Sequence, residues 1–281
     1  ESNESLIYHH LLTLAKSKAS TEVTSIPFPK LINDIKLLMI GIESESFKRA
    51  EDTLKFYPAM ELVCDDISNL SHYADGFLEM GTCFKRLKTY TSKNPFNQSH
   101  IFDGFLFKAF CDRVVKFLNH CRDIIYSQEI DTFLELHEST MKLRKIVVHL
   151  ARFLNIHPSS AGNQIAIPTG SDFLRLLYEE YTKVLDNDLK CFYIQLLKSC
   201  CEVYYLRYQE WFYHGQLDDP HKELFIYFVD HYNENTKHYF DKAYLVRKQS
   251  VPAFLHGCTD NVLLCGKYTM LLKSFKPMVS V

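Results

Sequence analysis

The amino-acid sequence predicts a mainly helical protein, and two observations lead to this prediction. The 281 residues include only 9 Gly and 9 Pro, whereas average usage gives about 20 Gly and 14 Pro in a chain of this length. A chain with few turn-forming residues and many bulky ones is expected to form long helices. Apolar residues also recur every three to four positions through most of the sequence, which is the spacing of one helix face.

The N-terminal half is expected to contain five helices. They span residues 4–18, 27–41, 60–90, 101–125 and 131–157. Pro27 and Pro29 precede the second helix, and Gly41 is placed to cap its end. The clearest periodicity lies in residues 101–125, whose apolar stripe is broad enough to face more than one neighbour. We expect residues 43–60 to form a loop.

The C-terminal half continues the helical pattern with one irregular interval. The expected elements are helices over residues 171–185, 188–211 and 252–273, and an extended run over residues 224–229. Ser171 and Asp188 are expected to cap the first two of these helices, and Pro252 to open the last. The least regular region is 216–250. The sequence contains no internal repeat.

The charge balance limits the classes of partner. Lys and Arg number 32 against 34 Asp and Glu, a net charge of −2, so the basic excess that drives nucleic-acid binding is missing. No stretch of 18 apolar residues occurs, and the most apolar stretch, residues 35–42, is too short to span a bilayer. The chain begins Glu1-Ser2-Asn3 with neither Met nor a leader. We therefore expect no nucleic acid, no membrane, and further residues beyond both ends of the natural protein.

The cysteines favour neither a metal site nor a disulfide framework. Nine are present, an odd number, at positions 64, 83, 111, 121, 191, 200, 201, 258 and 265. None forms a C-x-x-C pair or a cluster at zinc-finger spacing. Cys111, Cys121, Cys191 and Cys200 lie among apolar residues, where a free thiol acts as a small hydrophobic group in a reducing compartment. We expect a cytosolic protein.

The sequence motifs of several enzyme classes are incomplete here, because the required residues do not occur at the required spacing. Gly266-Lys267 is followed by Tyr268, where a phosphate-binding loop needs Ser or Thr. No His has Glu three residues before it, which excludes the Glu-x-x-His pairs of di-iron bundles, and His137 does not begin an H-E-x-x-H motif. We expect no catalytic residues, no cofactor and no metal.

Three polar clusters allow a functional and a structural interpretation. They are His9-His10 together with His214 and His221, then Asp218-Asp219-Pro220, and finally Lys85-Arg86-Leu87-Lys88. The functional interpretations are metal ligation, acid/base catalysis, and contact with anionic lipid or nucleic acid. The structural interpretations are favoured in each case: solvated histidines, a turn formed by Asp-Asp-Pro, and a solvated helix face.

The stretch around Trp211 carries a more specific signal. Its segments are Glu210-Trp211-Phe212-Tyr213-His214-Gly215-Gln216-Leu217-Asp218-Asp219-Pro220, Glu223-Leu224-Phe225-Ile226, Val251-Pro252-Ala253-Phe254-Leu255 and Leu264-Cys265-Gly266-Lys267-Tyr268. In order and spacing they resemble the first grip motif of the gamma-tubulin complex proteins. In that family a helix ends in Trp-x-x-x-Gly, a turn carries Asp and Pro, and an acidic residue precedes an apolar extended run. The resemblance covers residues 165–275, and is weaker over 31–47 and 102–110; Leu224 departs from it, since the family often has Phe there.

Physical reasons for the motif residues accompany the resemblance. Trp211 offers the largest side-chain area for anchoring a helix end, Gly215 supplies a left-handed cap, and Asp218 and Pro220 fix the turn. We expect the motif residues to specify the fold or a partner interface. They are Trp211, His214, Gly215, Asp218, Pro220, Glu223, Phe225, Ile226, Pro252, Phe254, Leu255, Gly266 and Lys267.

The resemblance implies a fold and a function. The fold is all-α, an elongated stack of helical bundles that forms one N-terminal grip domain over residues 1–281, with two sub-bundles at 1–157 and 168–281. The function is a non-enzymatic scaffold that associates laterally with the N-terminal domains of other gamma-tubulin complex proteins and so assembles the microtubule-nucleating template. Small helical proteins associated with such complexes are further partners. The chain stops before the second grip domain, through which the family binds gamma-tubulin.

The implied location is the cytoplasm, the cytoskeleton and the centrosome or another microtubule-organising centre. Two other classes of protein remain as alternatives. A membrane-tethering or lipid-binding adaptor would also be rich in Phe, Leu and Tyr, but it should carry a basic amphipathic face. A helical enzyme with a buried pocket would bind a metal or cofactor.

Overall fold

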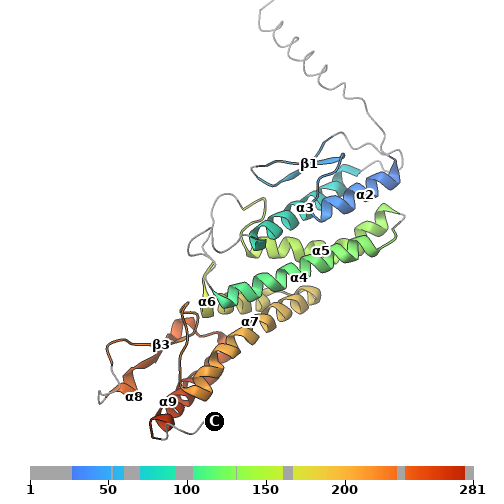
Figure 1. The fold of residues 1–281 in the computed structure, drawn as a ribbon. Helices are drawn as coiled ribbons and strands as arrows, with labels where there is room; N and C mark the ends of the chain where they lie inside the picture. The colour runs from blue at the N-terminus through green and yellow to red at the C-terminus, as the bar shows by residue number, and fades with distance from the viewer. Residues whose placement is uncertain are drawn as a thin grey trace, which may run out of the picture. The chain divides into compact units, whose positions relative to one another are not determined.

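Helices dominate the structure, which confirms the predicted all-α class. The computed structural model describes residues 27–51, 53–59, 70–92, 104–130, 132–160, 167–232 and 238–275, and these contain eight α-helices and two small antiparallel sheets (Figure 1). The helices are α2 (Phe28–Met39), α3 (Leu70–Ser92), α4 (Phe105–Ser127), α5 (Phe133–Phe153), α6 (Gly170–Lys183), α7 (Asn187–His214), α8 (Tyr239–Lys242) and α9 (Thr259–Phe275). The helix expected over residues 4–18 lies outside the described residues.

The chain divides into two compact units, each formed from two stretches of sequence. The first contains Glu1–Leu87 and Cys121–Gly162, and the second contains Lys88–His120 and Asn163–Val281. The division falls inside α3 and α4, so each of these helices contributes to both units. Residues 88–120, which the sequence analysis places in the first sub-bundle, belong here to the second unit.

The first unit packs α2, most of α3, the end of α4 and α5 around one apolar core. Its buried side chains include Leu38, Phe77, Met80, Ile125 and Leu150. Pro27 precedes α2 as its N-cap, and Gly41 at φ 74° follows its last turn. The N–H groups of residues 41 and 42 donate to the carbonyl oxygens of residues 38 and 37, at 2.8 and 3.0 Å. This is the Schellman arrangement expected of a C-terminal glycine.

The expected loop over residues 43–60 is wrong in one respect, because it contains a β-hairpin. Strand β1 (Phe47–Arg49) pairs antiparallel with β2 (Phe56–Pro58), and Phe47 lies opposite Pro58. Phe47 and Phe56 are buried in the core of the unit. Strands of three residues are too short to show an alternating pattern, so tertiary burial rather than sequence periodicity decides this hairpin.

The second unit is built around α7, which packs against α6 and α9. Aromatic side chains connect its helices. The ring of Phe173 on α6 lies 5.4 Å from that of Phe107 and 5.1 Å from that of Phe110, both on α4, and Phe117 lies 4.5 Å from Phe192 on α7. These edge and tilted contacts join three helices through their largest apolar groups.

Two predicted helix caps are displaced by two residues. Asp186, not Asp188, caps α7, and its carboxylate accepts the N–H groups of residues 188 and 189 at 2.9 and 3.2 Å. Thr169 holds the N-cap position of α6, while Ser171 lies in the first turn and bonds elsewhere. Either Asp of the sequence Asp-Asn-Asp could serve as a cap, because propensity alone does not distinguish positions two residues apart.

The irregular region 216–250 contains a second hairpin, and the last helix starts later than expected. Strand β3 (Ile226–Phe228) lies within the predicted extended run and pairs with β4 (Tyr244–Val246), so that Ile226 faces Val246. Pro252 opens a 3₁₀ helix, Ala253–Cys258, and only then does α9 begin. The predicted α-helix over residues 252–273 is therefore correct only from residue 259.

Candidate functional site

Trp211 anchors the end of α7 to α9. The side chain is fully buried, and its indole Nε1–H donates to the carbonyl oxygen of Val262 at 2.8 Å. The ring lies directly against the backbone of Gly266, where an added Cβ would come within 1.9 Å of Trp211 Cε2. The centroid of the Tyr244 ring in β4 lies 4.7 Å from that of the Trp211 ring. Trp211 and Gly266, 55 positions apart in the sequence, thus fit together as one contact.

Gly215 satisfies two requirements at once. It adopts φ 62° at the end of α7, and its N–H donates to the carbonyl oxygen of Trp211 at 3.1 Å. An added Cβ would lie 2.7 Å from the backbone nitrogen of Met270. The residue must therefore be glycine both for its left-handed conformation and for the close approach of α9.

The turn after α7 is closed by Asp219 rather than by Asp218, which corrects the role expected for Asp218. The carboxylate of Asp219 accepts the N–H groups of Glu223 and Leu224 at 2.8 and 2.9 Å. Asp218 is exposed and faces Arg207 across 3.5 Å. Pro220 occupies the second position of the turn, in which the N–H of residue 222 donates to the carbonyl oxygen of Asp219 at 3.2 Å.

Glu223 is buried and caps a helix more than one hundred residues away in sequence. Its two carboxylate oxygens accept the N–H groups of Phe105 and Leu106, the first residues of α4, at 2.9 and 3.0 Å. Both donors belong to the set that a helix leaves without partners at its N-terminus. The positive end of the α4 dipole also favours a carboxylate at this position.

The backbone of Glu223 holds the start of α6. Its carbonyl oxygen accepts both the N–H of Ser171 at 2.8 Å and the hydroxyl of Ser171 at 2.6 Å. Two glycines make room for it. An added Cβ at Gly170, where φ is 63°, would lie 2.5 Å from Glu223 Cα, and one at Gly104 would lie 2.5 Å from Glu223 Oε1. One residue thus joins the turn after α7 to the N-termini of α4 and α6.

The groups around Glu223 shift the pKa of its carboxyl in opposite directions. Burial raises the pKa of the carboxyl above its ordinary value, and the hydrogen bonds from Leu106 and Phe105 work against this rise. The neighbouring carboxylate of Asp219 raises this pKa further, and His221 lowers it. The net pKa is raised, because loss of water outweighs the two backbone donors.

The apolar motif residues range from fully buried to partly exposed. Phe225 is fully buried, with its ring 5.3 Å from that of Tyr208 on α7, and Ile226 is buried at the start of β3. Pro252 is buried, whereas Phe254 is partly exposed and lies 5.1 Å from the ring of Tyr178. Leu255 is half-buried, and its N–H donates to the carbonyl oxygen of Pro252 at 2.9 Å.

The basic motif residues make internal contacts. Lys267 is buried, its Nζ donates to the carbonyl oxygen of Asp241 at 2.9 Å, and burial lowers its pKa. Nδ1 of His214 is 2.9 Å from Nζ of Lys273. The ring of His221 packs against Phe105, with 4.9 Å between the ring centroids. The two histidines therefore have separate partners. We call the set formed by Trp211, Gly215, Asp219, Glu223 and Gly266 the Trp211 junction.

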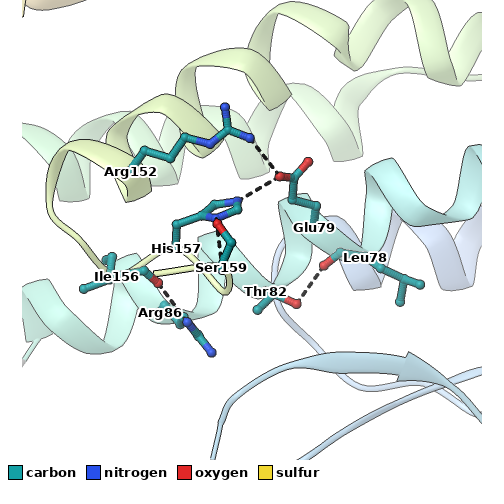
Figure 2. Close-up of polar contacts among 8 residues, drawn as sticks. All are labelled: Leu78, Glu79, Thr82, Arg86, Arg152, Ile156, His157 and Ser159. Atoms are coloured by element: carbon teal, nitrogen blue, oxygen red, sulfur yellow. Dashed lines mark hydrogen bonds and ion pairs between the residues drawn. The ribbon is translucent and has the colours of Figure 1, made fainter. Parts of the chain in front are cut away.

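A second polar cluster, in the first unit, was not singled out from the sequence. Figure 2 shows His157 between Glu79 of α3 and Ser159: His157 Nε2 is 2.8 Å from Glu79 Oε1, and the N–H of Ser159 donates to Nδ1 at 3.2 Å. Because Nδ1 accepts, the ring proton lies on Nε2 and is donated to Glu79. Arg152 of α5 also reaches Glu79 Oε1, at 3.2 Å.

Arg86 extends this cluster, so it departs from the solvated face expected at residues 85–88, whereas Lys88 is exposed as expected. Its guanidinium donates to the carbonyl oxygen of Thr53 at 2.6 and 3.0 Å and to that of Ile156 at 3.0 Å. It therefore links α3 to the β1–β2 hairpin and to the loop after α5. We call the set formed by Glu79, Arg86, Arg152, His157 and Ser159 the Glu79 cluster.

The cysteines divide between core and surface. Cys83 and Cys121 are buried, and burial raises the pKa of each thiol to about 12. Cys191, which the sequence placed on an apolar face, is exposed. The residues that the structure describes contain no group of three or more His, Cys, Asp or Glu arranged to hold a metal ion. Among the same residues, no helix combines the length and apolar character needed to cross a bilayer.

The pattern of the Trp211 junction agrees with a comparison to known protein families. A family model described as "Gamma tubulin complex component N-terminal" matches residues 32–279. The chain belongs to the gamma-tubulin complex component family. This confirms the family indicated by the motif residues, most of which are buried in the second unit.

Curated gamma-tubulin complex components resemble the chain over half of its length or more. Gamma-tubulin complex component 6 of Homo sapiens is 27% identical over 257 residues, which are 87% of this chain and 14% of that protein. Component 6 of Mus musculus is 27% identical over 256 residues, with the same coverage. A component 2 homolog of Drosophila melanogaster is 25% identical over 152 residues, 50% of this chain and 18% of that protein. The chain thus spans only 14% of the length of the two component 6 proteins.

The similarity to component 6 agrees with particular sequence segments. Residues 167–170, 177–180 and 196–202 resemble that member before the grip motif. In the structure they lie at the start of α6, within α6 and within α7. Trp211 lies on α7 and Glu223 contacts the start of α6, so the segments that indicate the individual member and those that indicate the family occupy the same unit.

Proposed function

We propose that this chain is a non-enzymatic scaffold domain of a gamma-tubulin complex, which lies side by side with the N-terminal domain of another gamma-tubulin complex protein. The observation that carries the proposal is the family match over residues 32–279. Such lateral contacts arrange gamma-tubulin molecules into the template from which microtubules grow. The chain acts in the cytoplasm, at the centrosome or another microtubule-organising centre.

The geometry of the Trp211 junction supports a scaffold role. A scaffold must keep the spacing between its contacts, and this requires helices that do not shift against one another. Trp211 fixes α7 to α9, while Glu223 fixes the turn after α7 to α4 and α6. Most motif residues are buried in these contacts, so their role is to specify the fold, and partner contacts lie on exposed positions.

The proposal assigns gamma-tubulin binding to another part of the protein. In the full-length protein a C-terminal domain, the second grip domain, binds gamma-tubulin, and the present domain sets the position of its neighbour. Small helical proteins associated with the complex are further partners of the helical surface. The domain uses no cofactor and no metal.

The decisive experiment is an association assay with purified N-terminal domains of other gamma-tubulin complex components. Sedimentation velocity should show a one-to-one complex with at least one of them, at micromolar concentration or below. An unrelated helical domain of similar charge serves as the control. If no component associates with the chain, lateral assembly is wrong for this domain, and binding to liposomes in a flotation assay would favour a lipid-binding adaptor.

A further inference from the structure

Ser250 follows two basic residues, in a pattern that no other hydroxyl of the chain shares. Arg247 and Lys248 occupy the third and second positions before it, and Val251 follows it. Among all serines and threonines of the sequence, Ser250 alone has Arg or Lys at both of these positions. Many protein kinases select substrates by such charge patterns, because acidic residues of the kinase bind the basic side chains that precede the reacting hydroxyl. The pattern indicates a substrate of a serine kinase of this kind.

The pattern lies on a single turn of 3₁₀ helix, η2 (Lys248–Ser250), which follows β4. The turn is closed by the N–H of Ser250, which donates to the carbonyl oxygen of Arg247 at 3.0 Å. Lys248 is exposed, whereas Val251 is buried. A kinase therefore needs the segment to open locally before it binds, and one 3₁₀ turn opens more readily than a packed α-helix.

The hydroxyl of Ser250 connects η2 to α6. It donates to Asp172 Oδ2 at 3.2 Å, and Asp172 lies in the first turn of α6. A phosphoryl group replaces this hydroxyl hydrogen, so the modified side chain can only accept hydrogen bonds from its surroundings. It also carries a charge of about −1.5 to −2 at pH 7. Phosphorylation thus turns an attractive contact with a carboxylate into a repulsive one.

The nearest cation to Asp172 already has two carboxylate partners. Arg175 Nε is 3.8 Å from Asp172 Oδ1, and Arg175 Nη1 donates to Glu179 Oε1 at 3.2 Å. Its single charge is shared, so it does not neutralise an added phosphate. All three side chains are partly exposed, and water and salt screen part of the repulsion. We therefore expect local opening of the contact between η2 and α6 rather than unfolding of the unit.

We propose that Ser250 is a phosphorylation site for a serine kinase that selects basic residues, and that the phosphate releases η2 from α6. In the reaction, Oγ of Ser250 bonds to the γ-phosphorus of ATP while the bond to the departing ADP breaks, and the hydroxyl proton passes to a carboxylate of the kinase. The kinase acts on the locally open segment. The phosphate then opposes closure, because Asp172 lies where the side chain would return. The site goes beyond the scaffold role and does not depend on lateral association.

Phosphorylation of the full 281-residue chain tests the site. The catalytic subunit of cyclic-AMP-dependent protein kinase, with ATP, is the probe, and peptide mass spectrometry locates the phosphate. The wild type should be phosphorylated on Ser250, and Ser250→Ala should take up no phosphate.

Two lysine variants separate the pattern from general charge. Lys248→Ala should slow the reaction at least about fivefold, because a charged contact with the kinase is lost. Lys242→Ala, the matched control, changes another exposed lysine outside the pattern and should stay within about twofold of the wild type. No phosphorylation of the wild type, an equal rate at another residue, or equal rates for the two lysine variants overturns the site.

Hydrogen exchange tests the release of η2. Peptides over residues 168–176 and 247–252 should exchange at least about threefold faster in the phosphorylated chain, and peptides of α5 should not change. Asp172→Asn removes the charge but keeps an acceptor for the hydroxyl, so phosphorylation of this variant should have less than about half the effect. Unchanged or slower exchange overturns the release, and so does an equal increase in Asp172→Asn. Failure to associate with other components would leave these results unaffected.

Discussion

The Trp211 junction and the Glu79 cluster perform the same structural task with different chemistry. Each connects the loop that follows a long helix to neighbouring elements: the turn after α7 in one case, and the loop after α5 in the other. The junction uses close backbone approach and buried groups, with Trp211 against Gly266 and Glu223 against α4. The cluster uses polar side chains, of which Glu79 is 38% and Arg152 61% exposed.

This difference determines how far water or another residue can replace a lost contact in each region. Where a ring lies against a glycine, no larger residue fits and water cannot fill the place of the lost contact. In the cluster, water can partly replace a lost hydrogen bond, because several of its groups already reach solvent. The junction should therefore be sensitive to single atoms, and the cluster should tolerate conservative change. Each prediction below tests this contrast by the free energy of unfolding.

The largest effect is expected from Gly266→Ala. Its Cβ would lie 1.9 Å from Trp211 Cε2, so the ring must leave its site. Displacing a buried Trp costs about 3 kcal/mol or more, which urea unfolding would detect. Gly257→Ala is the matched control, since nothing lies within 4 Å of its added Cβ, and its effect should stay within about 0.5 kcal/mol. Equal effects of the two variants would contradict the close contact.

The same substitution at Glu223 and at Glu79 compares the stability of the two regions most directly. Glu223→Gln replaces one acceptor oxygen by an NH₂ group that faces a backbone N–H at the start of α4. It should destabilise the chain by about 2 kcal/mol, because a buried donor is left without a partner. Glu79→Gln keeps an acceptor for His157 at a half-exposed position and should cost less than about 1 kcal/mol. A larger cost at Glu79 would reverse the contrast.

A smaller difference should separate two adjacent aspartates. Asp219→Ala removes two hydrogen bonds to the N–H groups of Glu223 and Leu224 and should cost about 1.5 kcal/mol. Asp218→Ala removes only an exposed ion pair with Arg207 and should change stability by less than about 0.5 kcal/mol. Thermal melts of the two variants side by side are sufficient. Equal losses would restore to Asp218 the turn role that the sequence assigned to it.

The smallest effect concerns pH. Because burial raises the pKa of Glu223, the folded state takes up its proton more readily than the unfolded state. This contribution to stability is fully present below the ordinary pKa of 4.5 and is lost as pH rises through the raised value. The wild type should therefore gain stability relative to Glu223→Gln as pH falls from 8 to 5. An unchanged or opposite trend in urea unfolding would contradict the raised pKa.

More of the Trp211 junction than of the Glu79 cluster can be predicted from the sequence, and the reason is physical. The Trp211 junction depends on residue types with narrow uses, such as a lone Trp, a left-handed Gly and Asp-Pro in a turn, so its members stand out in the sequence. The Glu79 cluster uses Glu, Arg, His and Ser, which are common on any surface, and its members come from α3, α5 and the loop after α5. Only folding brings them together.

Within the junction, the sequence located the residues more reliably than their roles. Trp211 and Gly266 were both expected to matter, but their direct contact is set by how α9 crosses α7. Glu223 was expected as a motif residue, yet its partners at the start of α4 are more than one hundred positions away. Asp218 and Asp219 are chemically identical neighbours, and only the direction of the turn decides which carboxylate meets the backbone.

By itself, the sequence determined the helical class and most helix positions, because periodicity and the scarcity of Gly and Pro act locally along the chain. It also determined the family, since the motif residues have fixed order and spacing. The tertiary structure alone decided the two hairpins, the far partners of Glu223 and the Glu79 cluster. These features depend on which surfaces meet, and a face that is buried or exposed only after helices pack leaves no local signal in the sequence.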